Sequence, residues 1–167
     1  MKWSMKAAGF ALAAMGIVVS CEIAMAETQP LSFEGAKWIW YSPGTGGNLN
    51  SLPAGVNYFR AEMTLPDNTQ GNSAQVKSAE VIVTCDNLFA LHLNGLGVGE
   101  CPVSNDAWGS PKRYDVTKLL VPGRNVVAVE AVNTLPGPAA LIVKLVAHLA
   151  DGQTVTLISD ETWKGYV

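Results

Sequence analysis

Apolar and polar residues alternate in short runs through most of the chain after residue 57. In residues 58–65, Phe59, Met63 and Leu65 lie on one face, and polar residues fill most of the other. An alternation with a period of two is typical of a half-buried β-strand. The same reasoning, together with runs of β-branched residues, predicts strands at 58–65, 79–85, 88–93, 96–100, 125–132, 141–149 and 154–159.

Turn-forming residues separate these strands. Asp86-Asn87, Asn94-Gly95 and Asp151-Gly152 are tight-turn pairs, because Asn, Asp and Gly tolerate turn conformations. Residues 114–120 are expected to be extended or to form a single turn, and 42–53 to form a long surface loop. Since no segment has a long period of 3.6 residues, the sequence predicts an all-β fold, an antiparallel β-sandwich of the jelly-roll type.

Antiparallel strands reverse direction at each turn, so alternate turns share an end of the sandwich. We therefore expect Asp86-Asn87, the loop 101–113 and the loop 133–138 at one end. The pairs Asn94-Gly95 and Asp151-Gly152 are expected at the other end.

The first residues have the layout of a secretory signal peptide. Lys2 and Lys6 precede an uncharged apolar run at 7–19, and Ala24-Met25-Ala26 follows as a cleavage signal. The predicted organisation is a signal peptide at 1–26, a linker at 27–35 and one β-sandwich domain at 36–167. This predicts a secreted or periplasmic protein.

A second interpretation of the same segment stays open. Val18-Val19-Ser20-Cys21 resembles a loose bacterial lipobox, although the usual leucine is absent. Lipidation of Cys21 would hold the protein at a membrane surface instead of releasing it.

Two of the three cysteines, Cys85 and Cys101, remain if the signal segment is removed. Export to an oxidising compartment and an even cysteine count predict a disulfide between them. The alternative is a pair of buried free thiols.

Composition excludes several classes of function. The net charge is −3, and no basic cluster suggests nucleic-acid binding. His92 and His148 have no metal-ligand neighbours at a suitable spacing, and no motif of a hydrolase, a P-loop or a dinucleotide site is present. No pair of carboxylates stands out as a glycosidase couple. We therefore expect a protein without catalytic activity of its own.

Aromatic residues are the most distinctive candidates for binding. Trp38, Trp40 and Trp163 are expected mainly to pack in the core or at its edge. Trp108 lies in the polar loop 101–113 and is the better candidate for contact with a ligand. Sugars present apolar faces for stacking and hydroxyls for hydrogen bonds, so an exposed tryptophan near amides and carboxylates suits them.

The predicted ligand site consists of Asp86, Asn87, Trp108 and Asn133 at one end of the sandwich. Asp86, loop carbonyls and the Asn133 amide also offer the hard oxygens that calcium prefers, so calcium is a candidate ion. The alternative is that Asp86 and Asn87 only form a turn.

Several segments resemble the galactose-binding-like jelly-roll domains at the front of bacterial α-L-rhamnosidases and in related secreted multidomain proteins. The most specific segment is Tyr114-Asp115-Val116-Thr117-Lys118-Leu119-Leu120, followed by Pro122-Gly123-Arg124-Asn125. The others are Ala36-Lys37-Trp38-Ile39-Trp40-Tyr41, Tyr58-Phe59-Arg60, Lys77-Ser78-Ala79-Glu80, Cys85-Asp86-Asn87-Leu88-Phe89, Leu93-Asn94-Gly95, Val129-Glu130-Ala131 with Asn133, and Ser159-Asp160 with Trp163.

The resemblance implies a β-sandwich that binds carbohydrate or packs beside a catalytic domain, and in some relatives holds calcium. Two features depart from the pattern, namely the Cys85 and Cys101 pair and the end of the chain soon after Trp163. The resemblance favours an exported carbohydrate-binding module without catalysis. The alternatives are a spacer or protein-interaction domain, with an envelope protein or a glycoside hydrolase as partner, and an accessory fragment of a glycoside hydrolase.

Overall fold

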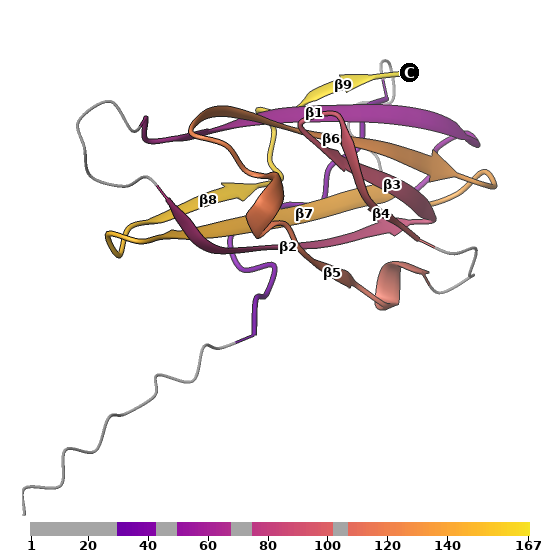
Figure 1. The fold of residues 1–167 in the computed structure, drawn as a ribbon. Helices are drawn as coiled ribbons and strands as arrows, with labels where there is room; N and C mark the ends of the chain where they lie inside the picture. Colours follow the sequence, from indigo (N-terminus) through magenta and orange to yellow (C-terminus); the bar gives the residue numbers. More distant parts are fainter. Residues whose placement is uncertain (1–29, 43–49, 68–74, 102–106) are drawn as a thin grey trace, which may run out of the picture.

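The fold is an antiparallel β-sandwich, as the sequence predicts (Figure 1). The computed structural model describes residues 30–42, 50–67, 75–101 and 107–167. The predicted signal peptide at 1–26, with Cys21, lies outside these residues. The strands are β1 (Gly55–Leu65), β2 (Val76–Asp86), β3 (Leu88–Leu93), β4 (Leu96–Glu100), β5 (Lys112–Asp115), β6 (Gly123–Asn133), β7 (Ala140–Leu149), β8 (Thr154–Ile158) and β9 (Lys164–Tyr166).

The strands form two sheets that face each other. The five-stranded sheet has the order β4-β3-β6-β1-β9, and the four-stranded sheet has the order β5-β2-β7-β8. All the strand pairs in both sheets are antiparallel. Two short 3-10 helices, η1 (Ala107–Gly109) and η2 (Thr117–Leu119), flank β5. The sequence pattern missed the short strand β9, which has no alternation long enough to detect.

Alternation along the strands places the core between the sheets. In β1 the side chains of Phe59, Met63 and Leu65 are buried, and in β6 Val127 and Val129 are buried opposite them in the same layer. Burying each such side chain contributes about 1.5–3 kcal/mol, which makes this layer the main source of stability. The face predicted for residues 58–65 is confirmed.

Cys85 and Cys101 do not form the predicted disulfide, and both side chains are buried. Cys85 belongs to β2 of the four-stranded sheet, whereas Cys101 follows β4 of the other sheet. The backbone N–H of Cys101 donates to the Phe89 carbonyl at 3.0 Å, so Cys101 stays with its own sheet. Burial raises the pKa of the Cys85 thiol, and the nearby Asp86 raises it further.

The loop predicted at 42–53 is not wholly at the surface. The side chain of Leu52 is fully buried, and its backbone exchanges hydrogen bonds with Gly137 at 2.8 and 2.9 Å. Residues 43–49 lie outside the described part of the chain. The sequence suggested a surface loop because isolated leucines among glycines, asparagines and serines show no periodicity.

The segment before the first strand contacts the four-stranded sheet. The Lys144 ammonium group donates to the Glu34 carbonyl at 2.8 Å, and Arg113 donates to the Leu31 carbonyl. Residues 30–35 of the predicted linker are therefore attached to the sandwich. None of the helices among the described residues is long and apolar enough to cross a bilayer.

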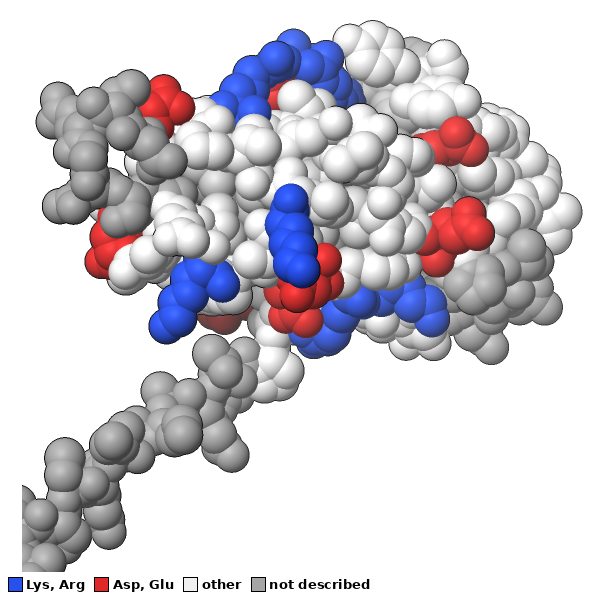
Figure 2. Space-filling view, in the orientation of Figure 1, with Lys and Arg blue, Asp and Glu red and all other residues white. Residues whose placement is uncertain are grey.

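Charged side chains are scattered over the surface (Figure 2). On the face shown, lysine and arginine lie beside aspartate and glutamate, with wide uncharged areas between them. Arg124 and Glu62, for example, form a two-point ion pair at 2.7 and 2.6 Å. This face carries no continuous basic surface of the kind that binds nucleic acid.

Candidate functional site

The loops predicted to share one end of the sandwich do so. The Asn87 side-chain oxygen accepts hydrogen bonds from the backbone and the hydroxyl of Thr134, at 2.9 and 3.0 Å. The Thr84 hydroxyl donates to the Trp108 carbonyl at 3.0 Å. These contacts bring the β2–β3 turn, η1 and the loop after β6 together, whereas Asn94 contacts the start of β6 at the other end.

A pocket of about 360 Å³ opens at this end. We call it the end pocket, and its lining is Trp38, Asn50, Asp86, Trp108, Pro138, Ala139 and Ala140. The side chains of Trp38 and Trp108 are 43% and 53% exposed, which is unusual for so large an apolar residue. Volumes of about 300–1,000 Å³ are typical of small-molecule sites.

Asp86 provides the carboxylate of the end pocket. It is partly buried at the end of β2, and this burial raises the pKa of the carboxyl group above its usual value. The Asn87 amide donates to Asp86 Oδ1 at 2.6 Å, which favours the charged form and opposes that effect. The second carboxylate oxygen has no hydrogen bond from Asn87, so it can accept one from a ligand.

Asn87 and Asn133 stabilise the loops at this end and do not belong to the lining of the end pocket. The Asn87 amide group donates a hydrogen bond to Asp86, and the Asn87 side-chain oxygen accepts one from the Thr134 N–H. Asn133 is buried, and its amide donates to the Pro53 carbonyl at 2.9 Å. Of the four predicted site residues, the fold brings Asp86 and Trp108 into one pocket. Contact between a ligand and the two asparagines stays a prediction.

The donor atoms at this end are compatible with calcium. Asp86 offers a carboxylate, and the buried oxygen of the Asn133 amide accepts no hydrogen bond within the described structure. Calcium takes about six to eight oxygen ligands, so backbone carbonyls and water would have to complete such a site. The described residues hold no cluster of three or more His, Cys, Asp and Glu side chains that would suit a metal.

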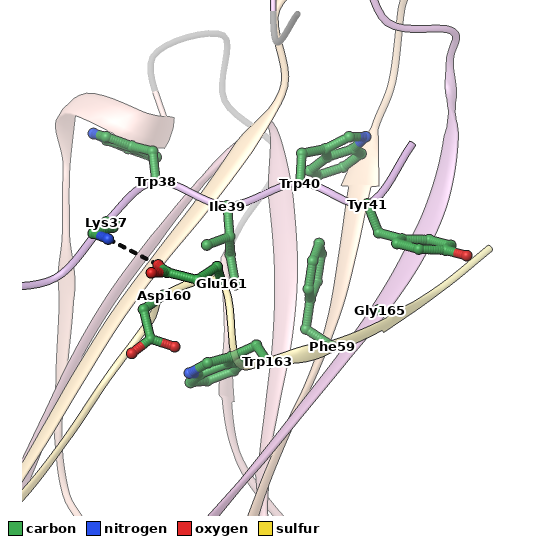
Figure 3. A pocket seen from close by; sticks show the side chains of 10 residues that line it. All are labelled: Lys37, Trp38, Ile39, Trp40, Tyr41, Phe59, Asp160, Glu161, Trp163 and Gly165. Atoms are coloured by element: carbon green, nitrogen blue, oxygen red, sulfur yellow. Dashed lines mark hydrogen bonds and ion pairs between the residues drawn. The ribbon is translucent and has the colours of Figure 1, made fainter. Parts of the chain in front are cut away.

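A second pocket, of about 380 Å³, shares Trp38 with the first and is drawn in Figure 3. We call it the aromatic pocket, and it is lined by Lys37, Trp38, Ile39, Trp40, Tyr41, Phe59, Asp160, Glu161, Trp163 and Gly165. The Lys37 ammonium group and the Glu161 carboxylate form an ion pair at 2.8 Å across its rim. Thus aromatic rings, two carboxylates and one cation surround a single cavity.

Backbone hydrogen bonds hold residues 37–41, which we call the ridge, beside both pockets. Ile39 and Leu141 exchange two backbone hydrogen bonds at 2.9 Å, next to Ala140 of the end pocket. The Lys37 N–H donates to the Ser159 carbonyl at 2.7 Å, next to Asp160 of the aromatic pocket. Trp38 lines both pockets from this ridge.

Of the three tryptophans expected to pack in the core or at its edge, Trp38 is the most exposed, at 43%, and lies at the edge. Trp163 is buried and donates its ring N–H to the Ile158 carbonyl at 2.8 Å, and Trp40 packs on Phe59 with ring centroids 5.9 Å apart. Figure 3 shows Trp38 and Trp40 on the same side of the ridge and Ile39 on the other. Period-two alternation does not separate the two rings, because Trp38 and Trp40 lie on the same face of the segment.

Comparison with curated proteins identifies an α-L-rhamnosidase as a relative of this chain. No family model matches the chain. The chain is 34% identical, over 139 residues, to an α-L-rhamnosidase of Streptomyces avermitilis, a match that covers 82% of this chain and 12% of that enzyme. It therefore spans about an eighth of the length of this relative.

Solved structures agree with the sequence match. The S. avermitilis α-L-rhamnosidase complexed with L-rhamnose superposes with a TM-score of 0.71 and 33% identity, covering 81% of this chain and 12% of that one. A lectin from Pleurotus ostreatus superposes with a TM-score of 0.65 and 27% identity, and the match covers 81% of this chain and 36% of the lectin. A rhamnosidase from Bacillus sp. GL1 superposes with a TM-score of 0.58 and 28% identity, and the match covers 79% of this chain and 13% of that enzyme. The chain is therefore homologous to one region of an α-L-rhamnosidase, and it belongs to the galactose-binding-like β-sandwich domains found in such enzymes.

Proposed function

We propose that this chain is a carbohydrate-binding domain that holds a sugar in the end pocket. The observation that carries the proposal is the lining of that pocket, where two half-exposed tryptophans meet a partly buried carboxylate. The rings of Trp38 and Trp108 offer apolar surfaces for the C–H faces of a sugar. Asp86 offers an acceptor for its hydroxyl groups.

The relatives support a sugar as the ligand. The P. ostreatus lectin has been solved in complex with GalNAc, with a TM-score of 0.61 and 26% identity to this chain. The S. avermitilis enzyme has been solved with L-rhamnose. The proposed function is binding without hydrolysis, in support of a catalytic domain that acts on the same glycan.

Export is part of the same proposal. A signal peptide at 1–26 would deliver the domain to the secreted or periplasmic space, where polysaccharides are accessible. Lipid attachment at Cys21 is the alternative route to the cell surface.

The direct test is a glycan array probed with the full chain, followed by calorimetric titration with the best ligands and with free L-rhamnose and GalNAc. Each titration is run with calcium and with a chelator, because calcium is a candidate ion at Asp86. We expect binding to at least one sugar class and a loss of that binding in a Trp38→Ala, Trp108→Ala double variant that still folds. Absence of binding to every glycan, in both conditions, would favour a spacer or protein-interaction domain instead.

A further inference from the structure

The aromatic pocket is a cavity that the proposed function leaves unused. Its walls come from both ends of the described chain, namely the ridge at 37–41 and residues 160–165 (Figure 3). It shares Trp38 with the end pocket, so the two cavities adjoin at this residue. A ligand that extends past Trp38 from one cavity would reach the other.

We propose that the aromatic pocket is a second subsite of the same carbohydrate site. In this arrangement the glycan crosses the ridge at Trp38, with one sugar unit in the end pocket and a following unit in the aromatic pocket. The ligand is then an oligosaccharide or a polysaccharide chain and not a single sugar. This inference rests on the proposed function, because it needs the end pocket to hold a sugar.

The chemistry of the aromatic pocket suits a sugar. Tyr41 is 40% exposed and offers a ring for stacking. Asp160 accepts hydrogen bonds from Thr162 through Oδ1 at 2.6 and 2.8 Å, which lowers the pKa of its carboxyl group and keeps it charged. Lys37 and Glu161 lie at the rim, where both side chains are more than half exposed. Their ion pair can exchange with sugar hydroxyls, because exposed pairs are weak.

The pocket is also held in shape before any ligand arrives. The Asn57 amide donates to the Tyr41 carbonyl at 2.6 Å and anchors the end of the ridge. Gly165 packs directly against Tyr41, since a Cβ atom built on Gly165 would lie 2.5 Å from the Cβ of Tyr41. A preformed pocket costs less ordering entropy when a ligand binds.

The charge and size of the cavity favour a glycan over an apolar peptide. Three charged side chains, Lys37, Asp160 and Glu161, line the cavity beside the rings. An apolar side chain placed there would strip water from them without replacing their hydrogen bonds. Sugar hydroxyls replace those bonds, and the volume of about 380 Å³ lies within the range of small-molecule sites.

The test compares a monosaccharide with oligosaccharides that end in the same sugar, chosen from the glycan array. The full chain is titrated with both by calorimetry. We expect the oligosaccharide to bind roughly tenfold or more tightly, which corresponds to about 1.4 kcal/mol. Tyr41→Ala should abolish that gain and leave the affinity for the monosaccharide unchanged, whereas Tyr41→Phe, which keeps the ring, should retain it.

Two further variants keep the test decisive. Tyr58→Ala is the matched control, because Tyr58 is exposed to a similar extent, 50% against 40% for Tyr41, but lines neither pocket. Glu161→Gln replaces a highly exposed side chain and should weaken oligosaccharide binding alone, even if Tyr41→Ala fails to fold.

The outcomes separate this inference from the proposed function. Equal affinity for the monosaccharide and the oligosaccharide, with no effect of Tyr41→Ala or Glu161→Gln, would overturn the second subsite while the end pocket stands. Absence of binding to any glycan by the unmodified chain would overturn both.

Discussion

The side-chain amide of Asn94 donates a hydrogen bond to the side-chain oxygen of Asn125 at 2.8 Å, which joins the β3–β4 turn to the start of β6. The same Asn125 oxygen accepts from the Val121 N–H at 2.8 Å. Its amide donates to the carbonyls of Val121 and Gly123 at 2.7 and 3.1 Å. Asn125 is fully buried, so these hydrogen bonds replace all of its contacts with water.

Replacing Asn125 with alanine should destabilise the fold strongly. The substitution removes the partner of partly buried groups of Val121, Gly123 and Asn94 and leaves a cavity at a fully buried position; an unpaired buried group costs about 1–3 kcal/mol. We expect the free energy of unfolding, measured by denaturant titration, to fall by about 3 kcal/mol or more. The neighbouring Arg124→Ala is the control, since it removes only an exposed ion pair with Glu62. Equal effects of the two variants would contradict this account of Asn125.

Trp108 and Trp163 should respond oppositely to substitution by alanine. Trp163 is buried, so its loss should cost about 3–5 kcal/mol of stability. Trp108 is half exposed, so Trp108→Ala should leave the melting temperature almost unchanged and weaken glycan binding roughly tenfold or more, about 1.4 kcal/mol. Thermal unfolding and calorimetry measure the two effects. A Trp108 variant that loses stability and keeps full affinity per folded molecule would assign this residue to packing.

Asp86 should make stability depend on pH in a defined direction. Because burial raises its pKa in the folded state, the protonated form favours folding. That contribution is fully present below the pKa of the unfolded chain, about 3.9, and is lost as the pH rises through the folded-state pKa. Asp86→Asn should therefore gain stability relative to the unmodified chain as the pH rises from about 3 to about 7.

Denaturant titrations of both proteins across this range measure the difference. Asp151→Asn provides the matched control, because Asp151 is an exposed turn residue at the opposite end of the sandwich. A stability difference for Asp86→Asn that stays constant with pH, or falls as the pH rises, would contradict the raised pKa.

The two core thiols should be unreactive in the folded protein. Burial raises the pKa of the Cys85 thiol and keeps it protonated, and the protonated thiol is a poor nucleophile. We expect an alkylating reagent to modify Cys85 and Cys101 only after denaturation, without added reductant. Peptide mass mapping measures the modification. A peptide pair linked through the two sulfurs would show instead that a disulfide forms.

The part of the sequence most specific to the family has a structural role. The Asp115 carboxylate accepts a hydrogen bond from the Thr117 N–H at 2.9 Å, and the Thr117 hydroxyl accepts one from Ala79 at 2.8 Å. Gly123 has a φ of 75°, a conformation that favours glycine. The Asn125 amide donates a hydrogen bond to the Gly123 carbonyl. These residues stabilise the end of the sandwich opposite Asp86. The resemblance therefore identifies the fold through its turns and says less about the ligand.

The sequence by itself determined the fold class, most strands and the grouping of loops at one end. Strand periodicity and turn chemistry are local properties, so residues such as Phe59, Met63 and Asn94 reveal them without knowledge of distant contacts. The same local reasoning identified Asp86 and Trp108 as candidates, because both lie in loops that alternate strands bring together.

Only the tertiary structure decided which rings are exposed and where the cavities lie. Trp38 is held at the surface by a segment whose backbone bonds Leu141 and Ser159, whereas Trp163 is buried and donates its ring N–H to the Ile158 carbonyl. The pairing of the two cysteines likewise depends on which sheet each strand joins. Such placements arise from contacts between residues far apart in the chain, so a pattern of neighbouring residues does not predict them.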